Sequence, residues 1–346
     1  LDDLHDQHPG WRAYTHQKNN LSAASASPGG KFGYWYDPQG KNYFTYYVQT
    51  GSLKNISAKI SVPLYNTEFD MPDYPNAAGF TGWMQNDSLV LINDEYDIWA
   101  LDPNARQAPV NITAGNGRKN KWVYEAYHFD SEQRYFKMGD TLWLSHFNKI
   151  NKEAGFSMKV LGSAVSPQSF GSAPYSYPSV VKAKDAQMFL VQQSHISASE
   201  IYAGNSFHHL KQMTHIADQQ KKYNWLTAEL IHWKMFDGKM SEGILYKPEN
   251  FDPHKKYPIV FYFYEKNADG LYAYKTPAPS ASIINIPYFV SNGYLDFDPN
   301  IYYKTGEPGA SAYNSVVSAA KYLSQFPYVD SAKMGIQGQS WGGYQV

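Results

Sequence analysis

The residues with the clearest potential for chemistry are Gly338-Gln339-Ser340-Trp341-Gly342-Gly343, near the end of the sequence. The spacing Gly-x-Ser-x-Gly matches a nucleophile elbow, a strained turn between a strand and a helix that exposes a serine hydroxyl. Glycine suits the outer positions, because a Cβ there would collide with the flanking strand or helix. With a general base in reach, such a serine is the nucleophile of acyl-transfer reactions. The alternative is a glycine-rich turn that contains an incidental serine.

The segments before this motif have the pattern of an α/β sheet. Residues 258–264 form a continuous apolar and aromatic run, as a strand buried on both faces requires. Residues 312–326 carry apolar side chains at three- and four-residue spacing, which predicts a helix. Residues 229–236 and 241–246 are predicted to form an antiparallel pair around the turn 237–238. The other predicted strands are a weaker one at 294–297 and a short one at 333–337. This order of strands and helix, closed by a tight glycine turn, predicts a parallel sheet.

Residues from about 20 to 215 show a different pattern, with short aromatic and apolar runs between turn residues. A turn, a strand and a partner strand recur four times, and the turns are spaced by roughly 45 to 57 residues, as in propeller blades with inserted loops. The turns are 27–31, 83–87, 138–140 and 184–185, and the strand pairs are 32–36 with 43–48, 89–92 with 98–101, 142–144 with 157–161, and 188–191 with 201–202. The alternative is a β-sandwich of irregular hairpins.

The change of pattern predicts two domains. The polar and charged stretch 218–222 is typical of a boundary between domains. We therefore expect incomplete propeller blades in residues 1–222 and an α/β domain in residues 223–346.

Composition excludes several classes of function. The 30 basic and 31 acidic side chains leave a net charge of −1, which does not favour a nucleic-acid partner. The absence of cysteine excludes disulfides, thiolate metal sites and a cysteine nucleophile. No apolar run is long enough to span a membrane. No metal-binding motif is present, so neither a metal nor another cofactor is expected.

The elbow and its neighbours resemble the prolyl oligopeptidase family of serine peptidases, which includes enzymes like dipeptidyl peptidase IV and acylaminoacyl peptidase. The motif Gly338–Tyr344 is similar to the family signature, and matching segments lie at 236–238, 244–248, 255–258, 291–294, 328–330 and, upstream, 96–99 and 111–113. The resemblance implies a propeller followed by the first portion of an α/β-hydrolase domain. It also implies peptide substrates and favours a periplasmic or secreted location, and it leaves homo-oligomerisation of the whole protein open.

The resemblance also implies roles for individual residues. Ser340 would be the nucleophile, and the backbone N–H of Trp341 and the hydroxyl of Tyr264 would form the oxyanion hole. The side chains of Trp341 and Tyr344 would line the substrate pocket, and Gly338, Gly342 and Gly343 would shape the elbow. The alternative for Tyr264 and for the side chain of Trp341 is that they only pack against their neighbours and have no role in catalysis or substrate binding. This sequence has Glu265-Lys266 after Tyr264, where the family usually has small residues, so the loop shape is expected to differ.

Part of the family pattern is missing. The family triad runs Ser, Asp, His along the chain, and the sequence ends six residues after Ser340, with all eleven histidines before Tyr264. We therefore expect a fragment of a longer peptidase that is inactive by itself, and about four blades predict a truncation at the N-terminal side as well. An adjacent glutamate pair, typical of dipeptidyl peptidases, is absent, and Asp94-Glu95 is expected to be a solvated turn. The alternatives are an esterase with the same elbow and a non-catalytic, peptide-binding propeller.

Overall fold

The structure is a computed structural model that describes residues 24–184, 188–280 and 282–346. The first residues of the chain and the predicted turn residue Asp185 lie outside these ranges. The described residues fall into two compact units. The first holds the residues up to Phe69, Asp73–Ile150 and Gly155–Ser172, and the second holds Asp70–Pro72, Asn151–Ala154 and Ala173–Val346. Within the described ranges, no helix is both long and apolar enough to cross a membrane.

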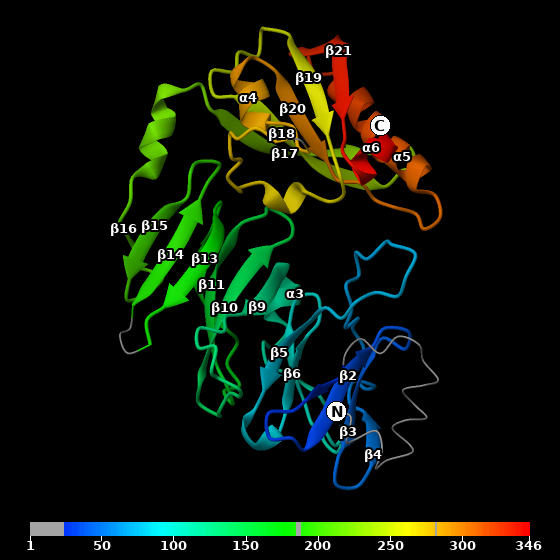
Figure 1. The fold of residues 1–346 in the computed structure, drawn as a ribbon, viewed down its shortest axis with the longest axis vertical. Helices are drawn as coiled ribbons and strands as arrows, with labels where there is room; N and C mark the ends of the chain where they lie inside the picture. The colour runs from blue at the N-terminus through cyan, green and yellow to red at the C-terminus, as the bar shows by residue number, and fades with distance from the viewer. Residues whose placement is uncertain (1–23, 185–187, 281) are drawn as a thin grey trace. The chain divides into compact units, whose positions relative to one another are not determined.

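The N-terminal region is built from four-stranded antiparallel sheets whose strands are consecutive in the chain (Figure 1). The first sheet holds β1 (Ser25–Ala26), β2 (Phe32–Asp37), β3 (Asn42–Tyr47) and β4 (Ser52–Asn55). The second holds β5 (Gly79–Trp83), β6 (Val90–Asn93), β7 (Ile98–Leu101) and β8 (Val110–Asn111). The third holds β9 (Trp122–Ala126), β10 (Thr141–Asn148), β11 (Ala154–Val160) and β12 (Gln168–Ala173). The fourth, which begins the second unit, holds β13 (Ser176–Lys182), β14 (Phe189–Ser194), β15 (Glu200–Gly204) and β16 (Lys211–Gln212).

These sheets confirm the prediction of blade-like repeats. Each predicted strand pair forms the two inner strands of one four-stranded sheet, as β2 with β3 and β6 with β7 illustrate. The short helices of this region are η1 (Gln85–Asp87), α3 (Asn116–Asn120) and η2 (Ile216–Lys222). A two-sheet sandwich would instead combine strands from several of these repeats in one sheet. The division of the chain at residues 222 and 223 stays a prediction.

The expectation of a solvated turn at Asp94 was wrong. Asp94 is only 4% exposed. Its carboxylate accepts hydrogen bonds from the backbone N–H groups of Tyr96 and Asp97, at 2.7 and 2.9 Å, and from Nε1 of Trp99, at 2.8 Å. A buried carboxylate is tolerated when donors surround it in this way, and here the turn between β6 and β7 and strand β7 itself supply them.

The C-terminal half contains a five-stranded mixed sheet with helices on both faces (Figure 1). Its strand order is β17-β18-β20-β19-β21, and the pairs of β19 with β20 and with β21 are parallel. The strands are β17 (Leu226–Lys234), β18 (Met240–Pro248), β19 (Tyr257–Tyr262), β20 (Leu295–Pro299) and β21 (Val329–Gln337). The helices are η3 (Ala268–Gly270), α4 (Ile286–Ser291), α5 (Pro308–Leu323) and α6 (Trp341–Gln345). The predicted parallel pairing is therefore present among β20, β19 and β21, and the antiparallel pair predicted at 229–236 and 241–246 is present as β17 and β18.

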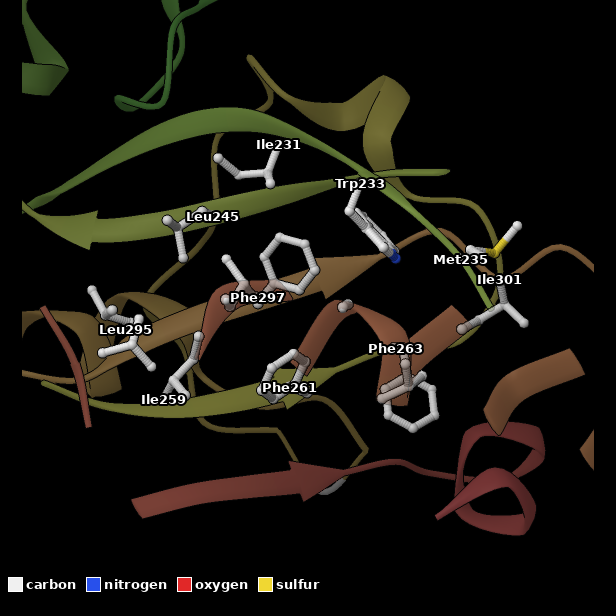
Figure 2. Packing of buried hydrophobic residues seen from close by; sticks show 14 of the residues in the cluster. Ile231, Trp233, Met235, Leu245, Ile259, Phe261, Phe263, Leu295, Phe297 and Ile301 are labelled. Atoms are coloured by element: carbon white, nitrogen blue, oxygen red, sulfur yellow. The ribbon is translucent and has the colours of Figure 1, made fainter. Parts of the chain in front are cut away.

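The two faces of this sheet carry separate apolar clusters. On one face, the rings of Trp233, Phe261 and Phe297 pack edge to face, with ring centroids 5.5 and 5.7 Å apart (Figure 2). The apolar side of α5 covers this cluster with Val316, Ala319 and Leu323. The opposite face packs against α4 and the segment before it, through residues that include Ile244, Tyr246, Tyr262, Ile286 and Val290. Burial on both faces explains the unbroken apolar run in β19.

Candidate active site

The nucleophile candidate Ser340 lies at the junction between a parallel strand and a helix. Strand β21 ends at Gln337 and helix α6 begins at Trp341. The backbone of Ser340 has φ 53° and ψ −118°, a conformation that non-glycine residues rarely adopt. Strained residues of this kind gather at functional sites, where the surrounding structure enforces them. The local geometry is thus that of the strained strand-to-helix turn that the motif predicted.

Close backbone packing explains two of the glycines of the elbow. A Cβ on Gly338 would clash with the carbonyl oxygen of Gly342. A Cβ on Gly342 would lie 2.7 Å from the carbonyl oxygen of Phe263. Gly343 is less constrained, because the nearest atom to its Cβ would be the carbonyl oxygen of Gly338 at 3.6 Å.

Ser340 and Tyr264 line the same cavity, which has a volume of about 920 Å³. Tyr264 lies two residues beyond the end of β19 and its side chain is 37% exposed. Among the described residues, the hydroxyls of Ser340 and Tyr264 and the backbone N–H of Trp341 make no hydrogen bond to protein. The amide is free because the first N–H groups of a helix have no intrahelical acceptor. The structure therefore places the candidate nucleophile and the two candidate oxyanion donors in one region, and their catalytic roles stay a prediction.

The aromatic residues of the elbow helix lie at a second cavity and beside it. Trp341 is 37% exposed and lines a cavity of about 440 Å³, together with Glu265 and Tyr303. The ring of Tyr344 stacks on that of Trp341, with centroids 5.1 Å apart. Tyr344 lines neither this cavity nor the one at Ser340, and its side chain is 61% exposed. A substrate-pocket role for both residues stays a prediction.

Two buried carboxylates near the larger cavity were not predicted. Asp298 of β20 lines the cavity, is 2% exposed, and accepts a hydrogen bond from Nδ2 of Asn267 at 3.0 Å. Burial raises the pKa of Asp298 to about 6. Asp296, two residues earlier, is fully buried, and neither of its carboxylate oxygens has a partner among the described residues. Burial, reinforced by Asp298, raises the pKa of Asp296 well above its ordinary value, which favours the protonated acid.

A third unpredicted residue, Tyr303, contacts the elbow directly. Its hydroxyl accepts a hydrogen bond from Nε1 of Trp341 at 2.8 Å. Tyr303 and Asp298 both come from the carboxyl end of a parallel strand or the segment just after it, where sites of α/β sheets gather. That position is the only sequence signal that could have pointed to them.

Among the described residues, no histidine lies beside Ser340 to act as a general base. No histidine lines either of the two cavities near the elbow. Groups of three or more His, Asp or Glu residues that could hold a metal ion do not occur in the described ranges either. The assignment of the acid and base to residues outside this sequence stays a prediction.

Comparisons with known proteins agree with the fold. No protein-family model matches the chain. Over 126 residues, the chain is 32% identical to a probable dipeptidyl-peptidase 5 of Aspergillus terreus, a match that covers 32% of this chain and 17% of that protein. A probable dipeptidyl-aminopeptidase B of Ajellomyces capsulatus is 26% identical over 147 residues, which cover 40% of this chain and 16% of the relative.

A solved structure extends the similarity to nearly the whole chain. The crystal structure of a putative dipeptidyl aminopeptidase IV from Bacteroides ovatus superposes with a TM-score of 0.57 at 16% identity, and it covers 94% of this chain. The match spans 49% of that structure, so the chain covers only part of the length of its relatives. Together with the elbow motif, these similarities support the resemblance to the prolyl oligopeptidase family, of the dipeptidyl-peptidase IV-like kind, over part of the length of its members.

Proposed function

We propose that the protein to which this chain belongs is a serine peptidase that hydrolyses oligopeptides through an acyl-enzyme on Ser340. The observation that carries the proposal is the strained backbone of Ser340 at the end of a parallel strand, beside a cavity that Tyr264 also lines. The names of the two sequence relatives, a probable dipeptidyl-peptidase and a probable dipeptidyl-aminopeptidase, support peptides as the substrates.

The reaction would proceed by attack of Oγ of Ser340 on the scissile carbonyl carbon. As the bond between Oγ and carbon forms, the hydroxyl proton passes to a general base, and the carbonyl oxygen becomes an oxyanion. The N–H of Trp341 and the hydroxyl of Tyr264 would donate to that oxyanion. The carbon–nitrogen bond then breaks, the amine leaves with the proton, and water hydrolyses the acyl-enzyme in the same way.

In this proposal, the general base that activates Ser340 is supplied by a part of the whole protein outside these 346 residues. The family resemblance implies an aspartate and a histidine that follow the elbow in the chain, and the described residues place no histidine at Ser340. A polypeptide of these 346 residues alone would then hydrolyse peptides several orders of magnitude more slowly than the whole protein.

Labelling with a fluorophosphonate probe tests the proposal. The complete protein, its Ser340→Ala variant and the 346-residue chain would be compared by intact mass and by turnover of chromogenic peptides and simple acyl esters. The matched control is Ser282→Ala, which removes another serine hydroxyl from the same cavity. We expect labelling and peptide turnover in the complete protein, retained in Ser282→Ala and abolished in Ser340→Ala. Absence of labelling would favour a non-catalytic peptide-binding role, and turnover of esters alone would favour an esterase.

A further inference from the structure

The hydroxyl of Tyr303 joins the two segments that carry the proposed oxyanion donors. It accepts hydrogen bonds from Nε1 of Trp341, at 2.8 Å, and from Nε2 of Gln345, both on the elbow helix. It donates to the main-chain carbonyl of Tyr264 at 3.1 Å. A phenol has one O–H and two lone pairs, so these three contacts use the whole hydrogen-bonding capacity of the group. Tyr303 therefore has nothing left to offer to an oxyanion, and its contacts are to the donors themselves.

Tyr303 is well placed to hold these segments in a fixed relation. The backbone N–H of Ile301, two residues earlier, donates to the carbonyl of Glu265 at 2.8 Å, and Ile301 is fully buried. The segment 301–303 is thus anchored to the segment that follows Tyr264. The Tyr303 ring also lies against the indole of Trp341, with centroids 6.1 Å apart. Burial raises the pKa of Tyr303, which keeps its hydroxyl protonated and able to donate.

We propose that Tyr303 is a positioning residue of the oxyanion hole, which sets the separation between the hydroxyl of Tyr264 and the amide of Trp341. This inference rests on the proposed function, since it needs Ser340 to be an acylated nucleophile. The physical reason is that oxyanion donors act only when they are held at the position that the developing charge will occupy. Without the hydroxyl of Tyr303, the loop that carries Tyr264 and the helix that begins at Trp341 would lose a side-chain group that is bonded to both.

The test compares Tyr303→Phe with Tyr313→Phe in the complete protein. Both changes remove one phenolic hydroxyl, but Tyr313 lies on α5 and is 59% exposed. Turnover is normalised to the fraction of molecules that a fluorophosphonate titrates, so that loss of folded protein does not register as loss of kcat. For Tyr303→Phe we expect kcat to fall by about tenfold or more and KM to change by less than about twofold, because interactions made only in the transition state are weakened. Tyr313→Phe should match the unchanged protein.

A double variant separates positioning through Tyr264 from a general structural role. If Tyr303 acts by placing the Tyr264 hydroxyl, then Tyr303→Phe should lower kcat by less than about twofold further in a Tyr264→Phe background. The proposal is overturned if Tyr303→Phe lowers kcat by the same factor in the Tyr264→Phe background as in the unchanged protein. It is also overturned if Tyr303→Phe alone leaves kcat per titrated site unchanged. If Tyr303→Phe does not fold, Trp341→Phe removes the indole donor and keeps an aromatic ring. An unchanged kcat in that variant overturns the proposal equally.

The same experiment keeps the two proposals apart. Labelling that survives Ser340→Ala contradicts the proposed function itself. Labelling at Ser340 combined with a Tyr303→Phe variant that behaves like Tyr313→Phe contradicts the positioning role and leaves the serine peptidase assignment intact.

Discussion

Gly342 lies against the carbonyl oxygen of Phe263, so that a Cβ added to Gly342 would be 2.7 Å from that oxygen. This contact joins the first turn of the elbow helix to the residue before Tyr264. The nucleophile and the proposed hydroxyl donor are therefore held together by main-chain packing, and no side chain intervenes at this point. Glycine is required here by the space available, since φ of Gly342 is not in the left-handed region.

This packing predicts a selective effect of alanine in the elbow. Gly342→Ala should lower the free energy of unfolding by about 1 to 3 kcal/mol, because the helix or the end of β19 must shift to admit the methyl group. Gly343→Ala is the matched control, as its Cβ would be 3.6 Å from the nearest atom. Alanine there should be neutral or stabilising by up to about 1 kcal/mol, from its higher helix propensity. Urea unfolding of both variants measures the difference, and equal effects would contradict the packing argument.

The hydroxyl of Tyr264 should matter for catalysis and hardly at all for stability. Tyr264→Phe in the complete protein is expected to lower kcat by about 10² to 10³, the usual effect of removing one oxyanion-hole donor. The unfolding midpoint should stay the same, since the side chain is partly exposed. Tyr274→Phe removes another hydroxyl at the same cavity and should leave kcat unchanged. Equal kcat values for the two variants would remove Tyr264 from the oxyanion hole.

The elements around the site could be predicted to different degrees. The apolar run of β19 and the apolar spacing of α5 were strong signals, and both elements are present. Helix α5 begins four residues earlier than predicted, at Pro308, because proline is well tolerated in the first turn of a helix. Helix α4 was not predicted, since six residues are too few for periodicity. Its signal is Asn285, whose side chain accepts from the backbone N–H of Tyr288 at 3.2 Å.

The residues of the candidate site likewise differ in how far the sequence could predict them. Ser340 and its glycines follow a local pattern, so the sequence could reveal them. Tyr303 and Tyr264 lie 39 positions apart, and their contact depends on strand order in the sheet, which no local pattern encodes. Asp296 and Asp298 alternate with Leu295 and Phe297, a pattern that ordinarily indicates one solvent-facing side. In this sheet both faces are covered, so the two aspartates are buried.

The burial of Asp298 predicts a specific pH dependence. Its pKa is raised from the ordinary 3.8 to about 6, so the folded protein binds this proton more tightly than the unfolded chain does. The contribution of Asp298 to stability is then greatest below pH 3.8 and is lost as the pH rises to about 6. A shift of this size corresponds to about 3 kcal/mol.

Asp298→Asn should remove this dependence. The variant is expected to be more stable than the unchanged protein at pH 7, and the difference should shrink as the pH falls toward 4. Asp330→Asn is the contrast, because a hydrogen bond from Lys333 lowers the pKa of Asp330, so its contribution is lost as the pH falls. Urea unfolding between pH 4 and 7 compares the two. If Asp298→Asn is less stable than the unchanged protein at pH 7, the folded protein must stabilise the ionised carboxylate, which contradicts the prediction.

A buried hydrogen bond attaches α5, the helix that lies in the chain between Tyr303 and the strand that leads to Ser340, to the sheet. Nε1 of Trp233 on β17 donates to the hydroxyl of Ser318 on α5 at 2.9 Å, and both residues are buried. Ser318→Ala leaves the indole N–H without an acceptor, so we expect a loss of about 1 to 3 kcal/mol in the free energy of unfolding. Ser324→Ala removes an exposed serine hydroxyl from the end of the same helix and should cost far less.

A double-variant cycle with Trp233→Phe isolates this interaction from the loss of packing. Once Trp233 is phenylalanine there is no indole N–H to satisfy, so Ser318→Ala should cost less than it does in the unchanged protein. A cost that is the same in both backgrounds would assign the effect of Ser318→Ala to the two helix carbonyls, of Asn314 and Ser315, that its hydroxyl also contacts. The bond between β17 and α5 would then contribute little, and the apolar side of α5 alone would hold the helix on the sheet.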